Sequence, residues 1–417
     1  MNVEGPLQGI RIVDLSTVVM GPWASQMLAD MGAEVIKVEP PQGDVTRQMG
    51  PARHPGMGAV FLCTNRNKRS IVLDLQQKEG RDAVLRLAEN ADVLLHNFRP
   101  QVAQKLCMQA EAFTERNPKL VYCAAFGFAS QGPLCDHPAY DDIIQSASGL
   151  AHLVGSVSDQ PRFVPSIVAD KTTAYAVVSA IMAALLQRGR TGRGQSIEVP
   201  MYETMVSFAL VEHLYGATFE PPVGPMGYSR ILTKERRPFK TADGYLTVLP
   251  YTDRNWRDFF RLTGREELTD HPDFATMAAR VANAGKVYAT IAELVANRAT
   301  DDLVRDLEAA QIPVMRVQTI EELLDDTQLE ASAFWQFVDH PTEGRLRLTR
   351  PPIRFSEGEQ RLRRHAPRLG EHSREILAEA GYTDEQIDQL TERCVTLQAA
   401  STLSPELNQT TIEEHAS

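Results

Sequence analysis

Short, almost continuously apolar runs alternate with helical segments along the first third of this 417-residue chain. Each run has the length of a β-strand, and Gly21 and Pro22 open a helix after the first of them. Strand–helix–strand units of this kind place their strands parallel in one sheet, and runs that are apolar on both faces indicate burial on both sides. We therefore predict an α/β fold with a doubly wound, mostly parallel open sheet. The predicted strands are residues 9–16, 33–39, 70–75, 92–98 and 120–128.

The carboxyl ends of the predicted strands are the places where a ligand is expected. In an open parallel sheet these ends converge on one rim, and ligands bind beyond it. No GxGxxG motif follows the first strand, so a dinucleotide site is not indicated. The basic run at residues 66–69 precedes a strand and is either a solvated face or a clamp on phosphate oxygens. The strand ends that form the rim are residues 16–19, 39–40, 97–99 and 126–128.

Residues 165–200 place one acid at the mouth of an uncharged helix. No charged residue occurs between 172 and 186, so this helix is expected to be buried on every face. It is shorter than the roughly 20 residues that a membrane span needs, which favours a core helix. Asp170 falls at or near the N-cap, where its carboxylate is either a structural cap or a nucleophile held ionised by the helix end. Glycines then end the helix, and residues 196–200 alternate like a strand.

Charge and cysteine usage limit the partners and the compartment. A formal net charge of −11 argues against nucleic acid and against an anionic membrane surface as partners. Residues 1–9 lack the basic and apolar regions of a signal peptide, so we expect a cytoplasmic protein. The cysteines show no CxxC pair and no clustering with histidine, which predicts free thiols and no metal site. They are Cys63, Cys107, Cys123, Cys135 and Cys394.

Composition also divides the chain into domains. Proline and glycine accumulate at residues 219–227, as in a linker, and an Asp243-Gly244 turn signal with several helical patterns follows. The tail has low hydrophobicity and is expected to be mobile. The predicted parts are a large domain that begins with residues 1–222, a smaller inserted α+β domain at 223–327, a return to the large domain at 328–395, and the tail at 396–417.

Several segments together resemble one enzyme family. They are LQGIRIVDLSTVVMGPWASQMLADMGAEVIKVEPPQGD from residue 7, NKRSIVLDL from 67, ADVLLHNFRP from 91, PAYDDIIQSASG from 138, Asp170 with its helix and TGRGQSIEVPMYE from 191, and RLGEH from 368. In this order they resemble the family III CoA-transferases, the CaiB/BaiF or formyl-CoA transferase-like family, over most of residues 5–380.

The resemblance implies a site and an assembly. Asp170 would accept the acyl group, coenzyme A or acyl-CoA would bind as a substrate with no tightly bound cofactor, and two chains would interlock as a homodimer. Pro40 and Pro138 stand where many relatives carry a basic residue, which leaves residues 66–69 or His137 as candidate phosphate contacts. The residues implied to lie along CoA are Val18, Val19, Leu73, Asn97, Phe98, Arg99, Lys105, Tyr140 and Met201.

Three functions are compatible with these patterns. The first is transfer of CoA from an acyl-CoA to a free carboxylic acid through a covalent intermediate on Asp170. The second is a 2-methylacyl-CoA racemase of the same superfamily, whose base is a histidine directly before the acid that is Asp141 here. This chain has Tyr140 at that place, and a tyrosine with an ordinary pKa of about 10 is a poor base. The third is a CoA-binding protein without catalysis.

The substrate is the least determined feature of the sequence. Some relatives close the acyl site with a glycine-rich loop, and residues 228–245 contain no glycine run, which disfavours oxalate and formyl-CoA. Succinyl-CoA is a possible donor. Arg230, Arg236 and Arg237 cluster at the start of the predicted small domain, and we hypothesise that one of them binds the far carboxylate of a dicarboxylic acyl group.

Overall fold

The computed structural model describes residues 5–158, 160–358 and 361–399 and divides the chain into two compact units. The first unit contains Met1–Ile144, Ile167–Met205 and Ala333–Ser417, and the second contains Gln145–Ser166 and Val206–Ser332. The predicted insertion at 223–327 lies inside the second unit, which also takes residues that the prediction gave to the large domain. Proline and glycine marked residue 222 as the boundary, whereas helix α9 (Met201–His213) passes from the first unit into the second without a break.

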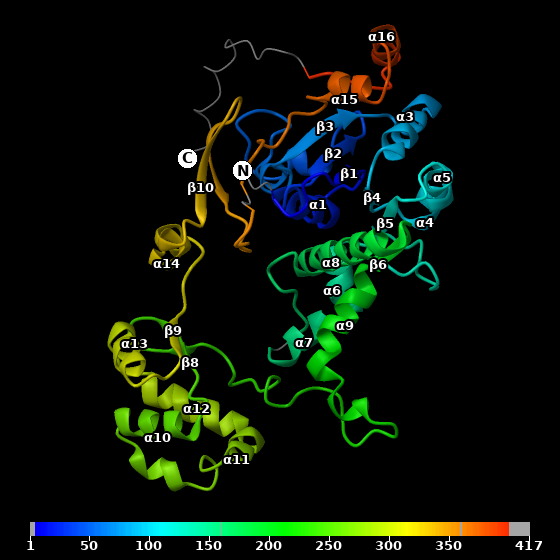
Figure 1. Cartoon of the computed structure of the whole chain (residues 1–417). Helices are drawn as coiled ribbons and strands as arrows, with labels where there is room; N and C mark the ends of the chain where they lie inside the picture. Colours follow the sequence, from blue (N-terminus) through cyan, green and yellow to red (C-terminus); the bar gives the residue numbers. More distant parts are fainter. Residues whose placement is uncertain (1–4, 159, 359–360, 400–417) are drawn as a thin grey trace, which may run out of the picture. The chain divides into compact units, whose positions relative to one another are not determined.

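A six-stranded parallel sheet forms the centre of the first unit (Figure 1), which confirms the predicted α/β architecture. Its strand order is β3-β2-β1-β4-β5-β6, so the direction of winding reverses between β1 and β4. Residues 196–200, predicted as a strand, pair with β5 at the edge. The strands are β1 (Arg11–Asp14), β2 (Glu34–Glu39), β3 (Lys68–Val72), β4 (Val93–His96), β5 (Val121–Phe126) and β6 (Ser196–Pro200).

Helices cover both faces of this sheet, as a doubly wound fold requires. On one face, alternate strand side chains such as Val13, Leu15, Ile36 and Val38 form a core with four helices. Helices α1 and α8 pack on each other and on the strands from the other side (Figure 1). The helices of the first face are α3 (Lys78–Glu89), α5 (Ala110–Thr114), α15 (Ser373–Glu379) and α16 (Asp384–Glu392), and those of the second are α1 (Met20–Asp30) and α8 (Val168–Thr191). Shorter helices are α2 (Ala59–Thr64), α4 (Pro100–Lys105) and α6 (Asp141–Ala147), and α7 (Leu150–Ser156) belongs to the second unit.

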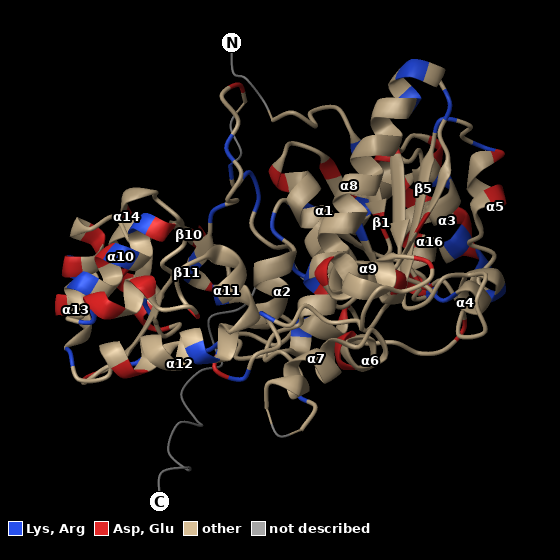
Figure 2. Ribbon diagram, turned by 90° about the horizontal axis from the view of Figure 1, so that it is seen from below, with Lys and Arg blue, Asp and Glu red and all other residues tan. Residues whose placement is uncertain are grey.

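Helix α8 is longer and less buried than predicted. It ends at Thr191, where Gly192 adopts a left-handed φ of 72°. One stripe of small and branched residues packs against α1, β5 and β6, whereas Tyr175 and Leu186 on other faces are 48% and 69% exposed. The expectation of burial on every face is therefore wrong for the single chain, because neighbours cover only one side. Figure 2 shows α1 and α8 with few charges. Among the described residues α8 is the one helix that is long and apolar enough to cross a membrane. Core helices of soluble proteins can meet the same criterion. In α8, 33% of the most apolar 18-residue stretch is buried.

The basic run at residues 66–69 is buried, so both of its predicted roles are wrong. Its cationic side chains form ion pairs with acidic residues that are far away in the sequence, so they are not available to a phosphate or to solvent. Long-range pairing of this kind leaves no local pattern in the sequence. The pairs are Arg66 with Asp30, Lys68 with Asp14 and Asn65, and Arg69 with Glu34, Glu375 and Glu379.

The second unit contains an α+β core, as predicted. A three-stranded antiparallel sheet has the order β7-β8-β9, and the predicted hairpin is closed by a 3.0 Å bond from the Thr241 amide to the Gly244 carbonyl. Aromatic side chains including Trp256, Phe259 and Phe260 fill the core against the helices. The elements are β7 (Phe239–Lys240), β8 (Tyr245–Val248), β9 (Val314–Arg316), α10 (Asp253–Leu262), α11 (Met277–Ala282), α12 (Ala284–Val295), α13 (Thr300–Ala309) and α14 (Thr327–Ala331).

The returning segment completes the first unit. Strands β10 (Trp335–His340) and β11 (Gly344–Thr349) form an antiparallel hairpin. Beyond residue 368 the chain forms two helices, α15 and α16, because Gly381 with φ of 82° turns the chain between them. The predicted mobile tail lies outside the described residues from 400 onward.

Candidate active site

A pocket of about 280 Å³ opens where the strand order reverses, beyond the carboxyl ends of β1, β4 and β5. This is the position at which an open parallel sheet binds its ligands. The turn after β1, the loop after β4 and the start of α8 all contribute to its walls. Of the residues predicted from the sequence, it is lined by Val18, Asn97, Phe98, Arg99, His137, Tyr140, Asp170 and Met201.

Three predicted CoA contacts are not among the residues that line this pocket. Leu73 is 0% exposed and belongs to the hydrophobic core, so its side chain has no access to a ligand. Val19 is buried beside the first turn of α1. Lys105 is exposed at the end of α4. Strand ends were correctly located by the apolar runs, but the runs do not distinguish residues that face the rim from residues that face the core.

Asp170 lies in the first turn of α8 but does not cap it. The N-cap residue is Ile167, and the carboxylate of Asp141 accepts hydrogen bonds from the amides of Ala169 and Asp170 at 2.7 and 3.0 Å. The helix end is therefore satisfied from a separate segment of the chain, and the predicted capping role of Asp170 is wrong. The carboxylate of Asp170 is left to face the pocket.

The surroundings of Asp170 shift its ionisation toward neutral pH. Burial and the nearby Asp141 carboxylate raise the pKa of Asp170 to about 7, while a hydrogen bond from the Met20 amide opposes this rise. The carboxylate is therefore ionised in full only on the alkaline side of neutrality, rather than held ionised by the helix end as the sequence predicted. Carboxyl groups with perturbed pKa values in clefts are typical of reactive sites.

The walls of the pocket are fixed by side chains that join its two loops. Asn97 accepts from the Thr17 amide at 3.1 Å and donates to the Thr17 carbonyl at 2.9 Å. The next residue, Phe98, donates its amide to Nδ1 of His96 at 3.1 Å. Burial lowers the pKa of His96 to about 3, so the ring is neutral and its Nδ1 can accept this bond. Asn97 thus holds the turn after the first strand through both polar groups of Thr17.

Sequence reasoning missed Asp141 and His96 as parts of this site. From the sequence, Asp141 was considered only as the neighbour of Tyr140. A capping acid that comes from another segment of the chain leaves no pattern near the helix that it caps. His96 is a titratable residue inside an otherwise apolar strand, which was the available signal. Tyr140 itself is 67% exposed at the pocket.

Two residues that the sequence suggested as CoA or phosphate contacts, Arg99 and His137, border the pocket. Arg99 is exposed and donates to the Asp136 carbonyl at 2.9 Å, and His137 lies in the same loop. Among the described residues no group of three or more His, Cys, Asp or Glu side chains is arranged to hold a metal ion.

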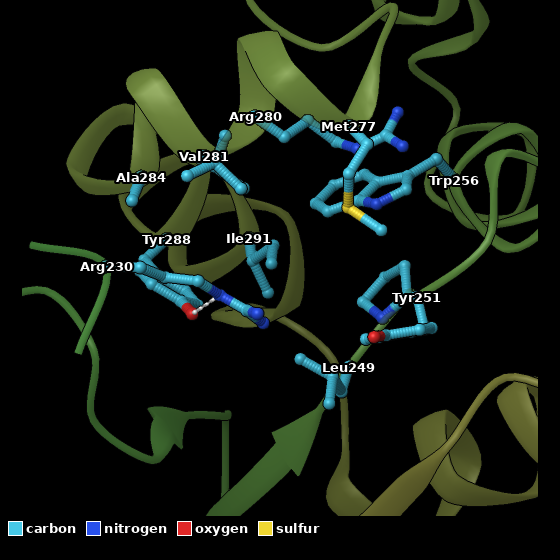
Figure 3. Close-up of a pocket in the computed structure, with 12 residues that line it drawn as sticks. Arg230, Leu249, Tyr251, Trp256, Met277, Arg280, Val281, Ala284, Tyr288 and Ile291 are labelled. Carbon is cyan, nitrogen blue, oxygen red and sulfur yellow. Dashed lines mark hydrogen bonds between the residues drawn. The ribbon is translucent and has the colours of Figure 1, made fainter. Parts of the chain in front are cut away.

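The arginines that we singled out for a dicarboxylate lie in the second unit. Arg230 lines a cavity of about 40 Å³ with Trp256, Met277 and Tyr288 (Figure 3). Its Nε donates to the Tyr288 hydroxyl at 3.3 Å, the bond drawn dashed in Figure 3. Arg236 and Arg237 are exposed. The structure thus separates one half-buried arginine in an aromatic cavity from two that face solvent.

A carboxylate with a raised pKa thus lies at the switch point of a doubly wound sheet, the place at which α/β enzymes bind their substrates. The profile of "CoA-transferase family III" matches residues 7–373. The chain is 36% identical over 91% of its length to a succinate–glutarate CoA-transferase of Agrobacterium fabrum and covers 96% of that protein. It is 33% identical to a succinyl-CoA:mesaconate CoA-transferase of Haloarcula hispanica, covering 90% of this chain and 97% of the relative.

A solved structure agrees with these matches. The crystal structure of a CaiB/BaiF family protein from Brucella suis superposes with a TM-score of 0.77 at 33% identity, covering 90% of this chain and all of that one. The chain belongs to CoA-transferase family III, and it is a CoA-transferase that acts on acyl-CoA and carboxylic acids.

Proposed function

We propose that the protein moves CoA from a dicarboxylic acyl-CoA, with succinyl-CoA as the donor, to a free dicarboxylic acid through covalent states of Asp170. The names of the two relatives above support this substrate class, since both act on dicarboxylic acids. The observation that carries the role of Asp170 is its freedom from capping: Asp141 satisfies the helix end, and the Asp170 carboxylate borders the pocket.

The reaction begins with attack of an Asp170 oxygen on the thioester carbonyl. The carbon–sulfur bond breaks, CoA leaves as the thiolate, and an acyl–aspartyl anhydride remains. The thiolate then attacks the aspartyl carbonyl, which releases the donor acid and forms an aspartyl-CoA thioester. The acceptor carboxylate attacks this thioester and again expels the thiolate. Attack of the thiolate on the acceptor carbonyl of the new anhydride gives the product thioester and restores Asp170.

Each nucleophilic step needs a carboxylate and a stabilised oxyanion. With the pKa of Asp170 at about 7, the attacking form predominates above that pH. The Met20 amide donates a hydrogen bond to Asp170 in the free enzyme. In the proposed reaction the same amide stabilises the negative charge that develops on the aspartyl carbonyl oxygen. No proton needs to be transferred in the balanced exchange, since thiolate and carboxylate are regenerated in turn.

We further propose that the enzyme works in the cytoplasm as a homodimer. The half-exposed apolar face of α8, with Tyr175 and Leu186, supports a protein partner at this helix. A second copy of the chain is the partner that family resemblance favours. Light scattering at nanomolar concentration should give the mass of a dimer, and an active monomer would contradict this part.

The central test is an exchange assay with wild type and Asp170→Asn. Succinyl-CoA and acetyl-CoA serve as donors, and a panel of mono- and dicarboxylic acids serves as acceptors. Asparagine keeps the size and the acceptor for the Met20 amide, so the variant should fold while exchange falls by about 10³-fold or more. Hydroxylamine added after acyl-CoA should label the wild-type peptide that carries Asp170. A folded variant with wild-type turnover, shown by mass spectrometry to retain asparagine, would remove Asp170 from the mechanism.

A further inference from the structure

The turn between β1 and α1 (residues 16–20) forms the wall of the pocket opposite Asp170. Val18 and Met20 line the pocket together with Asp170, and the Met20 amide donates to the Asp170 carboxylate. Val18 adopts a left-handed φ of 72°, which is unfavourable for a β-branched residue. A turn held in such a conformation must be fixed by its surroundings.

Side chains bind consecutive main-chain groups of this turn. Asp14 accepts from the Ser16 amide at 2.9 Å, and Lys37 Nζ donates to the Ser16 carbonyl at 3.0 Å. Asn97 binds both polar groups of the following residue, as described above. Asp44 accepts from the Val18 amide at 3.3 Å. The backbone from residue 16 to 18 is therefore held on every side without regular secondary structure.

Lys37 and Asp44 connect two of these contacts through a buried ion pair. Their side chains are fully buried, and Lys37 Nζ lies 2.8 Å from Asp44 Oδ2. Asp44 uses its other oxygen for the Val18 amide and for Thr46. Lys37 lies in the middle of the apolar strand β2, where a hydrophobic residue is expected. A buried ion pair contributes little net stability compared with an apolar pair, so its presence suggests a role in holding one conformation.

We propose that Lys37 and Asp44 are positioning residues of the transferase reaction, which set the turn at residues 16–20 so that the Met20 amide faces Asp170. They do not border the pocket themselves and act through the backbone of Ser16 and Val18. The proposal rests on the proposed function, because it assigns these residues to the step in which Asp170 gains and loses charge. The site thus includes two fully buried residues that lie outside the lining of the pocket.

Two double variants test the proposal in graded steps. Lys37→Met with Asp44→Asn removes the charges and the contact to the Ser16 carbonyl, but keeps an oxygen for the Val18 amide. Lys37→Met with Asp44→Val removes that oxygen as well. The matched control is Arg66→Met with Asp30→Asn, which removes another buried ion pair, with side chains 6% and 4% exposed, at the other end of α1 and outside the residues that line the pocket. Asparagine at position 30 likewise keeps the oxygen that binds Asn67.

Three readouts distinguish positioning from simple stability. Hydrogen exchange of the peptide spanning residues 12–24 should become at least tenfold faster at the turn in the first variant and faster still in the second. The value of kcat/KM should fall at least fivefold in the first variant and by a larger factor in the second. The acid limb of its pH profile should move to higher pH, because a displaced Met20 amide no longer favours the charged form of Asp170. The control should fold less stably but keep the exchange of this turn, kcat/KM and the pH limb.

Each result is decisive. If wild type shows no CoA exchange at all, the proposed function fails, and the hydrogen-exchange readout still tests whether the ion pair fixes the turn. If wild type is active and the first variant matches the control in exchange, rate and pH profile, the positioning role is overturned. If the second variant does not fold, the first variant alone tests the positioning role, because it loses only the charges of the ion pair and the hydrogen bond to the Ser16 carbonyl.

Discussion

Asp141 caps the helix that carries Asp170, and its carboxylate accepts the amide of Asp170 itself at 3.0 Å. The same oxygen binds the amide of Ala169 at 2.7 Å. Two acids are thus placed at one helix end, one bound to the backbone and the other facing the pocket. Burial and the charge of Asp141 together raise the pKa of Asp170. The structure of this helix end therefore affects the pH dependence expected of the reaction.

Removing the charge of Asp141 should make the enzyme more active in mild acid. Asp141→Asn keeps a capping oxygen, because asparagine caps helices as well as aspartate does. The repulsion of Asp170 disappears, so the acid limb of kcat/KM, expected near pH 7 in wild type, should move down by about one pH unit. Rates from pH 5 to 9 check this. An acid limb that stays in place would show that burial alone sets the pKa of Asp170.

Asp170 should also lower the stability of the folded chain at alkaline pH. The pKa of Asp170 is about 7 in the folded state and 3.8 ordinarily, so between these values the folded state binds more protons than the unfolded chain. The free energy of unfolding contributed by this group therefore falls as pH rises through that interval. Asp170→Asn should be more stable than wild type by about 4 kcal/mol at pH 8, and the difference should nearly vanish near pH 4.

Urea unfolding of both proteins at pH 4.5, 6 and 8 gives these differences directly. Asp142→Asn, at an exposed position in α6, is the matched control and should show no comparable pH-dependent gain. A constant difference between wild type and Asp170→Asn at all three pH values would contradict the shifted pKa.

Asn97 should matter through the turn that it holds. Asn97→Asp removes the donor to the Thr17 carbonyl and places a second oxygen against it. We expect a loss of about 1–3 kcal/mol in unfolding free energy and a rise of about tenfold in the KM for acyl-CoA. Steady-state kinetics with varied acyl-CoA measure the effect, and Gln104→Glu, the same amide-to-acid change at an exposed position, is the control. An unchanged KM would separate Asn97 from substrate binding.

One of the three singled-out arginines should distinguish acceptor acids. Arg230 differs from the other two, because it lines a cavity and donates to the Tyr288 hydroxyl, whereas Arg236 and Arg237 are exposed. Loss of a bidentate carboxylate contact should raise the KM for dicarboxylates by at least about tenfold and leave monocarboxylates unchanged. Single alanine variants of all three, assayed with matched acid pairs, decide the point. Unchanged dicarboxylate kinetics in all three would refute the hypothesis.

The sequence predicted the sheet and its rim because both depend on local patterns, whereas the role expected of Asp170 came from the family resemblance. The apolar runs that became β1, β2 and β4 are short-range signals, and Val18, Asn97 and Phe98 follow from where those runs end. The pattern could not predict the partners of residues 66–69, since Glu375 and Glu379 lie about 300 residues away in the chain. For the same reason it could not show that Asp141, 29 residues before Asp170, satisfies the end of α8.

The returning segment imposes an order on synthesis. Arg69 on β3 depends on Glu375 and Glu379, and the amide of Asp74 binds the carbonyl of Val395. A nascent chain that has emerged only to residue 350 therefore exposes an arginine without these acids and an apolar face still waiting for Ile376 and Leu377. The packing of the sheet is therefore complete only once α15 and the segment up to Val395 have been made, so during synthesis this face stays uncovered for longer than in a domain encoded by one continuous segment.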